Sequence, residues 1–245
     1  MHGRFRSPCA AIARQLQKAA TSAHVLPWRP NRGPDYPSAE SPDDYLPRTN
    51  YVPACSPEEY RRRSFAVNVT GTENLVHAAQ AAGVQRFVYT ASNSVVLGGQ
   101  RIAGGDETLP YTSRFNDLYT ETKVIAEKFV LGQNGVEEML TCSIRPSGIW
   151  GRGDQTMFRK MFEQVIAGRV KVLVGSKDVR LDNSYVHNLI HGFILAAEHL
   201  VPGGTAPGQA YFINDGEPVN MFEFARPVVE ACGERFPKVR VPGRL

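Results

Sequence analysis

Long apolar runs, closely spaced cysteines and a large charge excess are all missing from this 245-residue sequence. No stretch approaches the roughly 20 consecutive apolar residues that a helix needs to cross a bilayer, so no membrane-spanning segment is expected. Cys9, Cys55, Cys142 and Cys232 stand far apart without a C-x-x-C spacing, which indicates neither a metal site nor a disulfide framework. We therefore expect a reducing, cytoplasmic setting. A net charge of +4 is too small to indicate a nucleic-acid partner.

Glycine is scarce in residues 1–56, which contain only Gly3 and Gly33 but 8 of the 17 prolines. Beyond a short helical pattern over residues 10–20, no helix or strand period persists there, and proline at this density opposes regular structure. We expect an irregular, disordered segment. Its early residues are basic, with no acid before Asp35, as in a mitochondrial transit peptide. The interpretation we favour is a mispredicted start or an out-of-frame stretch.

Helical and strand patterns alternate from Ser56 onward. Ser56 as N-cap, Pro57 at the first helical position and acids at 58 and 59 predict a helix start, and Gly83 predicts its end. The patterns predict helices over 57–82, 117–132, 156–167, 186–200 and 221–232, and strands over 85–90, 140–145, 170–174 and 210–214. Single short strands between helices are typical of βαβ units. We expect an α/β fold with a mainly parallel sheet and helices on both faces.

Two polar segments follow the first predicted strand, at the edge formed by the carboxyl ends of the strands, where parallel sheets usually carry their functional groups. TASNS (90–94) ends that strand, and YTETK (119–123) opens the next helix. Tyr119 and Lys123, four residues apart, share a helix face. A phenol with a pKa of about 10 is a poor base at neutral pH, and a nearby ammonium lowers that pKa by stabilising the phenolate. With the Ser92 hydroxyl close by, Tyr119 could then exchange a proton with a substrate oxygen.

These residues also have ordinary structural explanations. Tyr119 and Lys123 could form the edge of an amphipathic helix and Ser92 could lie in a solvated loop, since one Y-x-x-x-K spacing is weak evidence. Three further segments stand in a fixed order around them: NVTGT (68–72), YTAS (89–92) and RPSGIWG (145–151). Together with the Tyr119–Lys123 pair, they resemble the extended short-chain dehydrogenases/reductases.

That resemblance implies a role for each matching position. Ser92, Tyr119 and Lys123 would form the catalytic triad, and Asn68 would help to order the proton relay. The implied cofactor-binding residues are Thr90, Ala91, Tyr119, Lys123, Pro146 and Ile149. The implied substrate-binding residues are Ser92, Asn93, Trp150, Tyr185 and His187, although a histidine between apolar neighbours is more often a packing residue.

Downstream segments resemble one branch of that superfamily, the 3β-hydroxysteroid dehydrogenase/isomerase family, and its actinobacterial members in particular. They are DNSYVHN (182–188) and GQAYFIND (208–215), and the match runs from about residue 59 to 238. The resemblance implies an incomplete Rossmann-like sheet with a small substrate-binding lobe in the C-terminal half of a partial domain, 57–245. It also implies oxidation of a sterol 3β-hydroxyl with NAD, often followed by double-bond isomerisation.

The glycine-rich turn with which this family receives the cofactor diphosphate has no counterpart before Gly71. We therefore expect weak NAD binding and marginal stability, and the choice between NAD and NADP stays open. Family members usually continue beyond the last residues seen here, so peripheral membrane association through missing C-terminal sequence and a homodimer are both retained as expectations. The alternatives are a sugar-nucleotide epimerase or reductase of the same superfamily and a non-catalytic, truncated remnant.

Overall fold

The computed structural model describes residues 56–155 and 158–241. They belong to the larger of two compact units, Pro53–Leu245. The segment predicted to be irregular, 1–56, lies outside the described residues except for Ser56. No helix within the described ranges is long and apolar enough to cross a membrane.

A helical segment opens the described chain, as α2 (Pro57–Phe65), one π-helical turn (Ala66–Thr70) and α3 (Gly71–Ala81) follow one another directly. The predicted N-cap is confirmed, because Ser56 Oγ accepts a hydrogen bond from the Glu59 amide at 3.2 Å. The predicted end at Gly83 is also confirmed, with a φ of 69°. The predicted helix is confirmed over this range, and the π turn within it inserts an extra residue into the hydrogen-bond ladder.

A three-stranded parallel sheet forms the centre of the unit. Its order is β1-β2-β6, with bounds Arg86–Thr90, Leu140–Pro146 and Ala210–Ile213. Two short parallel pairs flank it: β3 (Ile149–Trp150) with β5 (Ser184–Tyr185), and β4 (Val172–Val174) with β7 (Val239–Val241). Since Thr90 pairs with Ile144, the carboxyl ends of β1 and β2 open at one edge.

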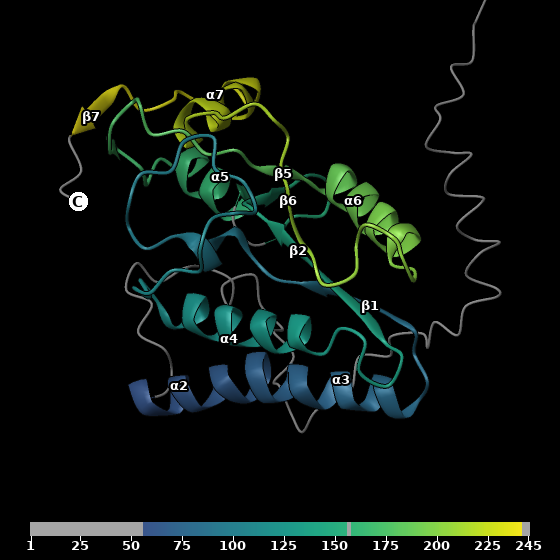
Figure 1. Ribbon diagram of the computed structural model, residues 1–245. Helices are drawn as coiled ribbons and strands as arrows, with labels where there is room; N and C mark the ends of the chain where they lie inside the picture. Colours follow the sequence, from purple (N-terminus) through teal and green to yellow (C-terminus); the bar gives the residue numbers. More distant parts are fainter. Residues whose placement is uncertain (1–55, 156–157, 242–245) are drawn as a thin grey trace, which may run out of the picture. The chain divides into compact units, whose positions relative to one another are not determined.

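Helices cover both faces of the central sheet. In Figure 1, α4 (Leu118–Gly132) lies on one face and α6 (Val186–His199) on the other, while α2 and α3 pack outside α4. Cys142 and Ile144 point from β2 to the α6 side, where Leu189 and Ala196 are buried. On the α4 side, Val76, Val130 and Met139 form a separate core. The predicted α/β class, with a parallel sheet and helices on both faces, is confirmed.

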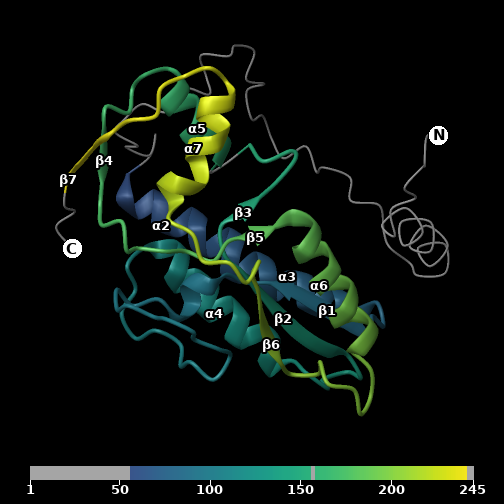
Figure 2. The ribbon, with the colours of Figure 1, turned by 90° about the horizontal axis from the view of Figure 1, so that it is seen from above.

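The C-terminal half adds a smaller group of elements with its own core. It comprises α5 (Phe158–Ile166), α7 (Met221–Ala231), β4 and β7, and Figure 2 shows α5 and α7 side by side. Its buried residues are Val165, Leu173, Ala225, Val229 and Phe236. The sequence places its expected substrate-binding lobe in this half of the chain, and that role stays a prediction.

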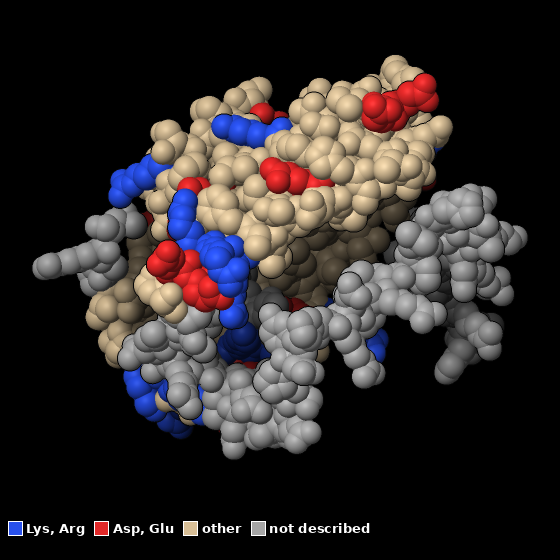
Figure 3. Space-filling model, turned by 90° about the horizontal axis from the view of Figure 1, so that it is seen from below, with Lys and Arg blue, Asp and Glu red and all other residues tan. Residues whose placement is uncertain are grey.

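Several charged side chains of α2 form exposed ion pairs. Arg61 bonds Glu121 at 2.9 Å, and Glu59 accepts from Arg62 at 2.8 Å and from Arg63 at 2.6 Å. Figure 3, viewed from the side of α2 and α3, shows basic and acidic side chains gathered together. Solvent and salt screen such exposed pairs, so these contacts contribute little to stability.

Candidate active site at the carboxyl ends of the first two strands

Ser92 lies where β1 ends and a 3₁₀ turn, Asn93–Val96, begins. Its backbone is extended, with φ −161° and ψ 150°, and its side-chain oxygen caps the turn by accepting from the Ser94 amide at 3.2 Å. The side chain is buried at 9% exposure. This cap fixes the direction of the hydroxyl at the sheet edge.

Tyr119 and Lys123 reach the same edge from the first turns of α4. The helix begins there because Asp117 caps it, accepting from the Thr120 amide at 2.6 Å. The Tyr119 phenol and the Ser92 hydroxyl lie close enough for Ser92 to lower the pKa of Tyr119. Lys123 Nζ lies 5.8 Å from the centre of the Tyr119 ring and donates to the carbonyl oxygen of Thr90 at 2.9 Å. The structure thus brings together three of the residues to which the resemblance assigns catalysis.

The protonation of this group differs from the expectation. The sequence predicts a pKa of Tyr119 below its ordinary value, but burial raises that pKa, and the nearby Asp117 carboxylate adds to the rise. The nearby Ser92 hydroxyl opposes this rise in pKa. Burial also lowers the pKa of Lys123, while the charge of Glu127 acts the other way. Desolvation therefore sets the direction of the pKa shift of both groups.

Asn68 lies within the π turn and faces α4. Its amide Nδ2 donates to Thr122 Oγ1 at 3.0 Å, and its carbonyl oxygen accepts from the Thr72 hydroxyl at 2.8 Å. Thr122 in turn donates to the Tyr119 carbonyl at 2.9 Å. Thr122 was missed by the sequence reasoning, although its position between Tyr119 and Lys123 was a usable signal.

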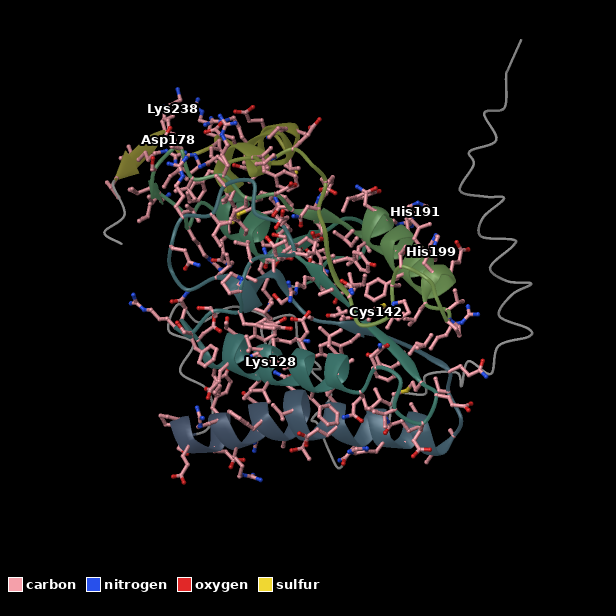
Figure 4. The ribbon with its side chains drawn as sticks, viewed as in Figure 1. Lys128, Cys142, Asp178, His191, His199 and Lys238 are labelled. Atoms are coloured by element: carbon pink, nitrogen blue, oxygen red, sulfur yellow. The ribbon has the colours of Figure 1, made fainter. Side chains whose placement is uncertain are left out.

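A buried ion pair stands one helical turn behind Lys123. Arg145 Nε donates to Glu127 Oε1 at 2.9 Å, and the two side chains are 5% and 0% exposed. Figure 4 labels Lys128, the next residue along α4. Neither Glu127 nor Arg145 was predicted as part of a site, because a glutamate on a helix is most often solvated.

The predicted substrate-binding aromatics form a group of their own. Trp150 and Tyr185 lie with ring centres 4.7 Å apart, and His187 is 5.2 Å beyond Tyr185. Asn93 connects this region to the triad, since its amide donates to Ser147 Oγ at 3.0 Å and the Ser147 amide donates to Ser184 Oγ at 2.9 Å.

The remaining predicted cofactor residues border the same edge. The Ala91 amide donates to the Ile144 carbonyl at 2.8 Å, which continues the β1–β2 ladder past Thr90. Pro146 ends β2 beside Ile213 and is buried, whereas Ile149 in β3 is 39% exposed. These positions line the carboxyl ends of two neighbouring strands.

Asp215 is a further residue that sequence reasoning missed. Its two oxygens accept from Trp150 Nε1 at 2.7 Å, from the Tyr185 amide at 2.8 Å and from Asn188 Nδ2 at 2.8 Å. One carboxylate thus holds β3, β5 and α6 together after the end of β6.

Comparison with known proteins decides the family. The model of the 3-beta hydroxysteroid dehydrogenase/isomerase family matches residues 50–242. This chain belongs to that family. A 3-beta-hydroxysteroid dehydrogenase of Mycolicibacterium neoaurum is 84% identical over 188 residues, which are 77% of this chain and 51% of that protein. A 3 beta-hydroxysteroid dehydrogenase/Delta 5-->4-isomerase of Mycobacterium tuberculosis is 81% identical over 186 residues, 76% of this chain and 50% of that protein.

The chain thus spans about half the length of these 3β-hydroxysteroid dehydrogenase relatives. A solved short-chain dehydrogenase/reductase superfamily protein of Agrobacterium tumefaciens with bound NAD aligns with a TM-score of 0.59 and 24% identity, covering 77% of this chain and 65% of that one. This likeness shows the shared fold.

The family uses a nicotinamide cofactor, and the described residues fit one end of it. Lys123 is half-buried beside Tyr119 and donates one of its three N–H groups to the Thr90 carbonyl. The other two could donate hydrogen bonds to the hydroxyls of a ribose. Residues 56–155 and 158–241 contain no G-x-x-G-x-x-G spacing, so a diphosphate cradle of that kind is not among them. The described site fits the nicotinamide end alone.

Proposed function

We propose that this chain takes part in the oxidation of a steroid or sterol 3β-hydroxyl with a nicotinamide cofactor, NAD in the first instance. The observation that carries the proposal is the meeting of Ser92, Tyr119 and Lys123 at the end of β1. The identity of 81–84% to proteins named as 3β-hydroxysteroid dehydrogenases supports the substrate class.

In this mechanism, the Ser92 hydroxyl bonds the substrate oxygen and Tyr119 takes its proton. Tyr119 is 45% exposed, so a substrate oxygen can reach the phenol beside the buried serine. When bound, the cofactor supplies the hydride acceptor at the carbon that loses hydrogen. Lys123 stabilises the phenolate that takes the proton, while Asn68 and Thr122 hold the backbone of α4 at Tyr119 in place.

The raised pKa of Tyr119 has a direct consequence for the rate. At neutral pH the phenol is mostly protonated, which suits ketone reduction, whereas alcohol oxidation needs the phenolate. We therefore expect oxidation to become faster as the pH rises above neutrality. A subsequent double-bond isomerisation, suggested by the name of the second relative, is proposed for the same substrate class.

The test is steady-state oxidation of a 3β-hydroxysteroid by the purified chain, with NAD and with NADP in parallel. Tyr119→Phe should abolish turnover and leave the thermal melt unchanged, while Tyr60→Phe on α2 serves as the matched control. Preferential turnover of nucleotide sugars would overturn the substrate class. Unchanged activity of Tyr119→Phe would overturn the mechanism, and a folded chain inactive on every substrate would favour the non-catalytic alternative.

A further inference from the structure

The face of α4 that carries the proposed catalytic pair continues for another turn. Tyr119, Lys123 and Glu127 follow at spacings of four and therefore share one side of the helix. Glu127 is fully buried, and Lys123 is half-buried in front of it. Burying the charge of a carboxylate is costly unless that charge is paired, so its position on this face requires an explanation.

Arg145 pairs with the Glu127 carboxylate, but part of its own guanidinium has no hydrogen-bond partner. Its Nε donates to both Glu127 oxygens, at 2.9 and 3.2 Å, but its Nη1 is buried without a hydrogen-bond partner. The guanidinium lies over the rings of Tyr111, at 5.2 Å, and Phe212, at 5.3 Å. It is thus fixed by aromatic packing and holds the carboxylate in one position.

The groups around Lys123 place Glu127 as its acidic neighbour. The Lys123 ammonium contacts the Thr90 carbonyl and lies 5.1 Å from the centre of the Tyr89 ring on β1. On α4, Tyr119 precedes it by one turn and Glu127 follows it by one turn, with Arg145 of β2 paired to Glu127. The remaining nearby groups are Asp117, which faces Tyr119, and Tyr111, which faces Arg145. The ammonium is desolvated by this packing, which favours its neutral form.

We propose that Glu127 is a positioning residue of the active site: Arg145 holds its carboxylate one helical turn behind Lys123, so that a fixed negative charge faces the half-buried ammonium beside Tyr119. The inference rests on the proposed function for its purpose, since a neutral amine could not stabilise a phenolate. Glu127 and Arg145 touch neither substrate nor cofactor in this scheme.

The experiment measures the charge of Lys123 without needing turnover. The full chain is labelled with a trace of isotopic acetic anhydride across a pH series, and mass spectrometry gives the reactivity of each lysine. Glu127→Gln should move the midpoint of Lys123 to lower pH by about one unit. Arg145→Gln, which leaves the carboxylate without its partner, should move it to higher pH. Glu127→Asp should restore part of the wild-type value.

Glu121→Gln is the matched control, because Glu121 lies on the same helix but pairs with the exposed Arg61. It should leave the Lys123 midpoint in place. An unchanged midpoint in folded Glu127→Gln would overturn the inference. If Glu127→Gln does not fold, the labelling midpoint of Lys123 in Arg145→Gln is the test. A midpoint that is unchanged or moves to lower pH in that variant would equally overturn the inference. An inactive chain with the predicted shifts would contradict only the proposed function.

Discussion

Asn68 and Thr122 join two helices through one hydrogen bond, from amide Nδ2 to hydroxyl Oγ1 over 3.0 Å, although they are 54 residues apart. Asn68 can point at α4 because a π turn interrupts the helix at that position. π turns often occur at functional sites. The extra residue changes the direction in which a side chain leaves the helix, compared with the direction in a regular α-helix. Here the rotated side chain supports the backbone immediately after Tyr119.

Thr122→Val tests this link. Valine has the shape of threonine but cannot accept the Asn68 hydrogen bond, so the free energy of unfolding should fall by about 1–2 kcal/mol. If α4 is positioned through this bond, turnover should also fall by about tenfold or more, because small displacements of reacting groups are costly. Urea unfolding and steady-state kinetics measure the two effects. A variant that is less stable but fully active would reduce the bond to a structural role.

The sequence predicted most of the fold because its determinants are local. The N-cap of Ser56 and the glycine stop at Gly83 depend on residues within one helical turn. The Tyr119–Lys123 pair was equally visible, since a spacing of four is itself the helix geometry. The π turn was not, because Asn68 is bonded to a residue 54 positions away.

Electrostatics could not be read from spacing either. The ammonium of Lys123 was expected to lower the pKa of Tyr119, yet the direction of the shift is set by burial. How far a side chain is desolvated depends on which strands and helices pack around it, and this is known only once the chain is folded. Asp215 escaped prediction for the same reason, because its three donors come from separate elements.

Asp215→Asn should loosen the aromatic group around Trp150. The amide keeps one accepting oxygen but turns an NH₂ toward groups that are themselves donors, so the free energy of unfolding should fall by about 2–3 kcal/mol. The indole of Trp150 should lose its fixed partner, and its fluorescence should change. Because the chain also contains Trp28, the spectra are best recorded in a Trp28→Phe background.

Asp182→Asn is the matched control for that change. Asp182 is half-buried and accepts one backbone hydrogen bond, from Gly216 at 3.0 Å. Its replacement should leave the Trp150 emission unaltered and cost little stability. Equal effects of the two substitutions would contradict a special role for Asp215.

Gly192→Ala probes the close approach of α6 to the sheet. A Cβ built on Gly192 would stand 2.8 Å from Ile213 Cδ1 and 2.9 Å from its Cγ1, so the isoleucine must move. Overpacking of about 1–3 kcal/mol should exceed the gain of up to about 1 kcal/mol in helix propensity, and the protein should be destabilised. In Gly132→Ala, at the end of α4, a Cβ meets nothing within 4 Å, and stability should be kept or rise. A Gly192→Ala variant as stable as the wild type would show that the helix has room to move.

Cys142 predicts a specific weakness at alkaline pH. It lies on β2 (Figure 4) with no exposed surface, and burial raises the pKa of its thiol from 9.0 to about 11. Between these values the unfolded chain has lost the proton while the folded chain still holds it. The free energy of unfolding must therefore fall as the pH rises through this window, by about 2–3 kcal/mol in total. The stabilising contribution of the protonated thiol is fully present only below pH 9.

Cys142→Ala removes this titration and should flatten the dependence of the free energy of unfolding on pH between 9 and 11. Urea unfolding at several pH values measures the slope, and the small loss from the missing sulfur shifts the whole curve without changing that slope. Tyr89, whose pKa burial raises to about 12, titrates in an overlapping window but is common to every variant. Cys232→Ala, at an exposed position, should retain the wild-type slope. Parallel curves for the two alanine variants would mean that the Cys142 thiol ionises no later in the folded chain than in the unfolded one, and the apolar packing between β2 and α6 could not then exclude water from it.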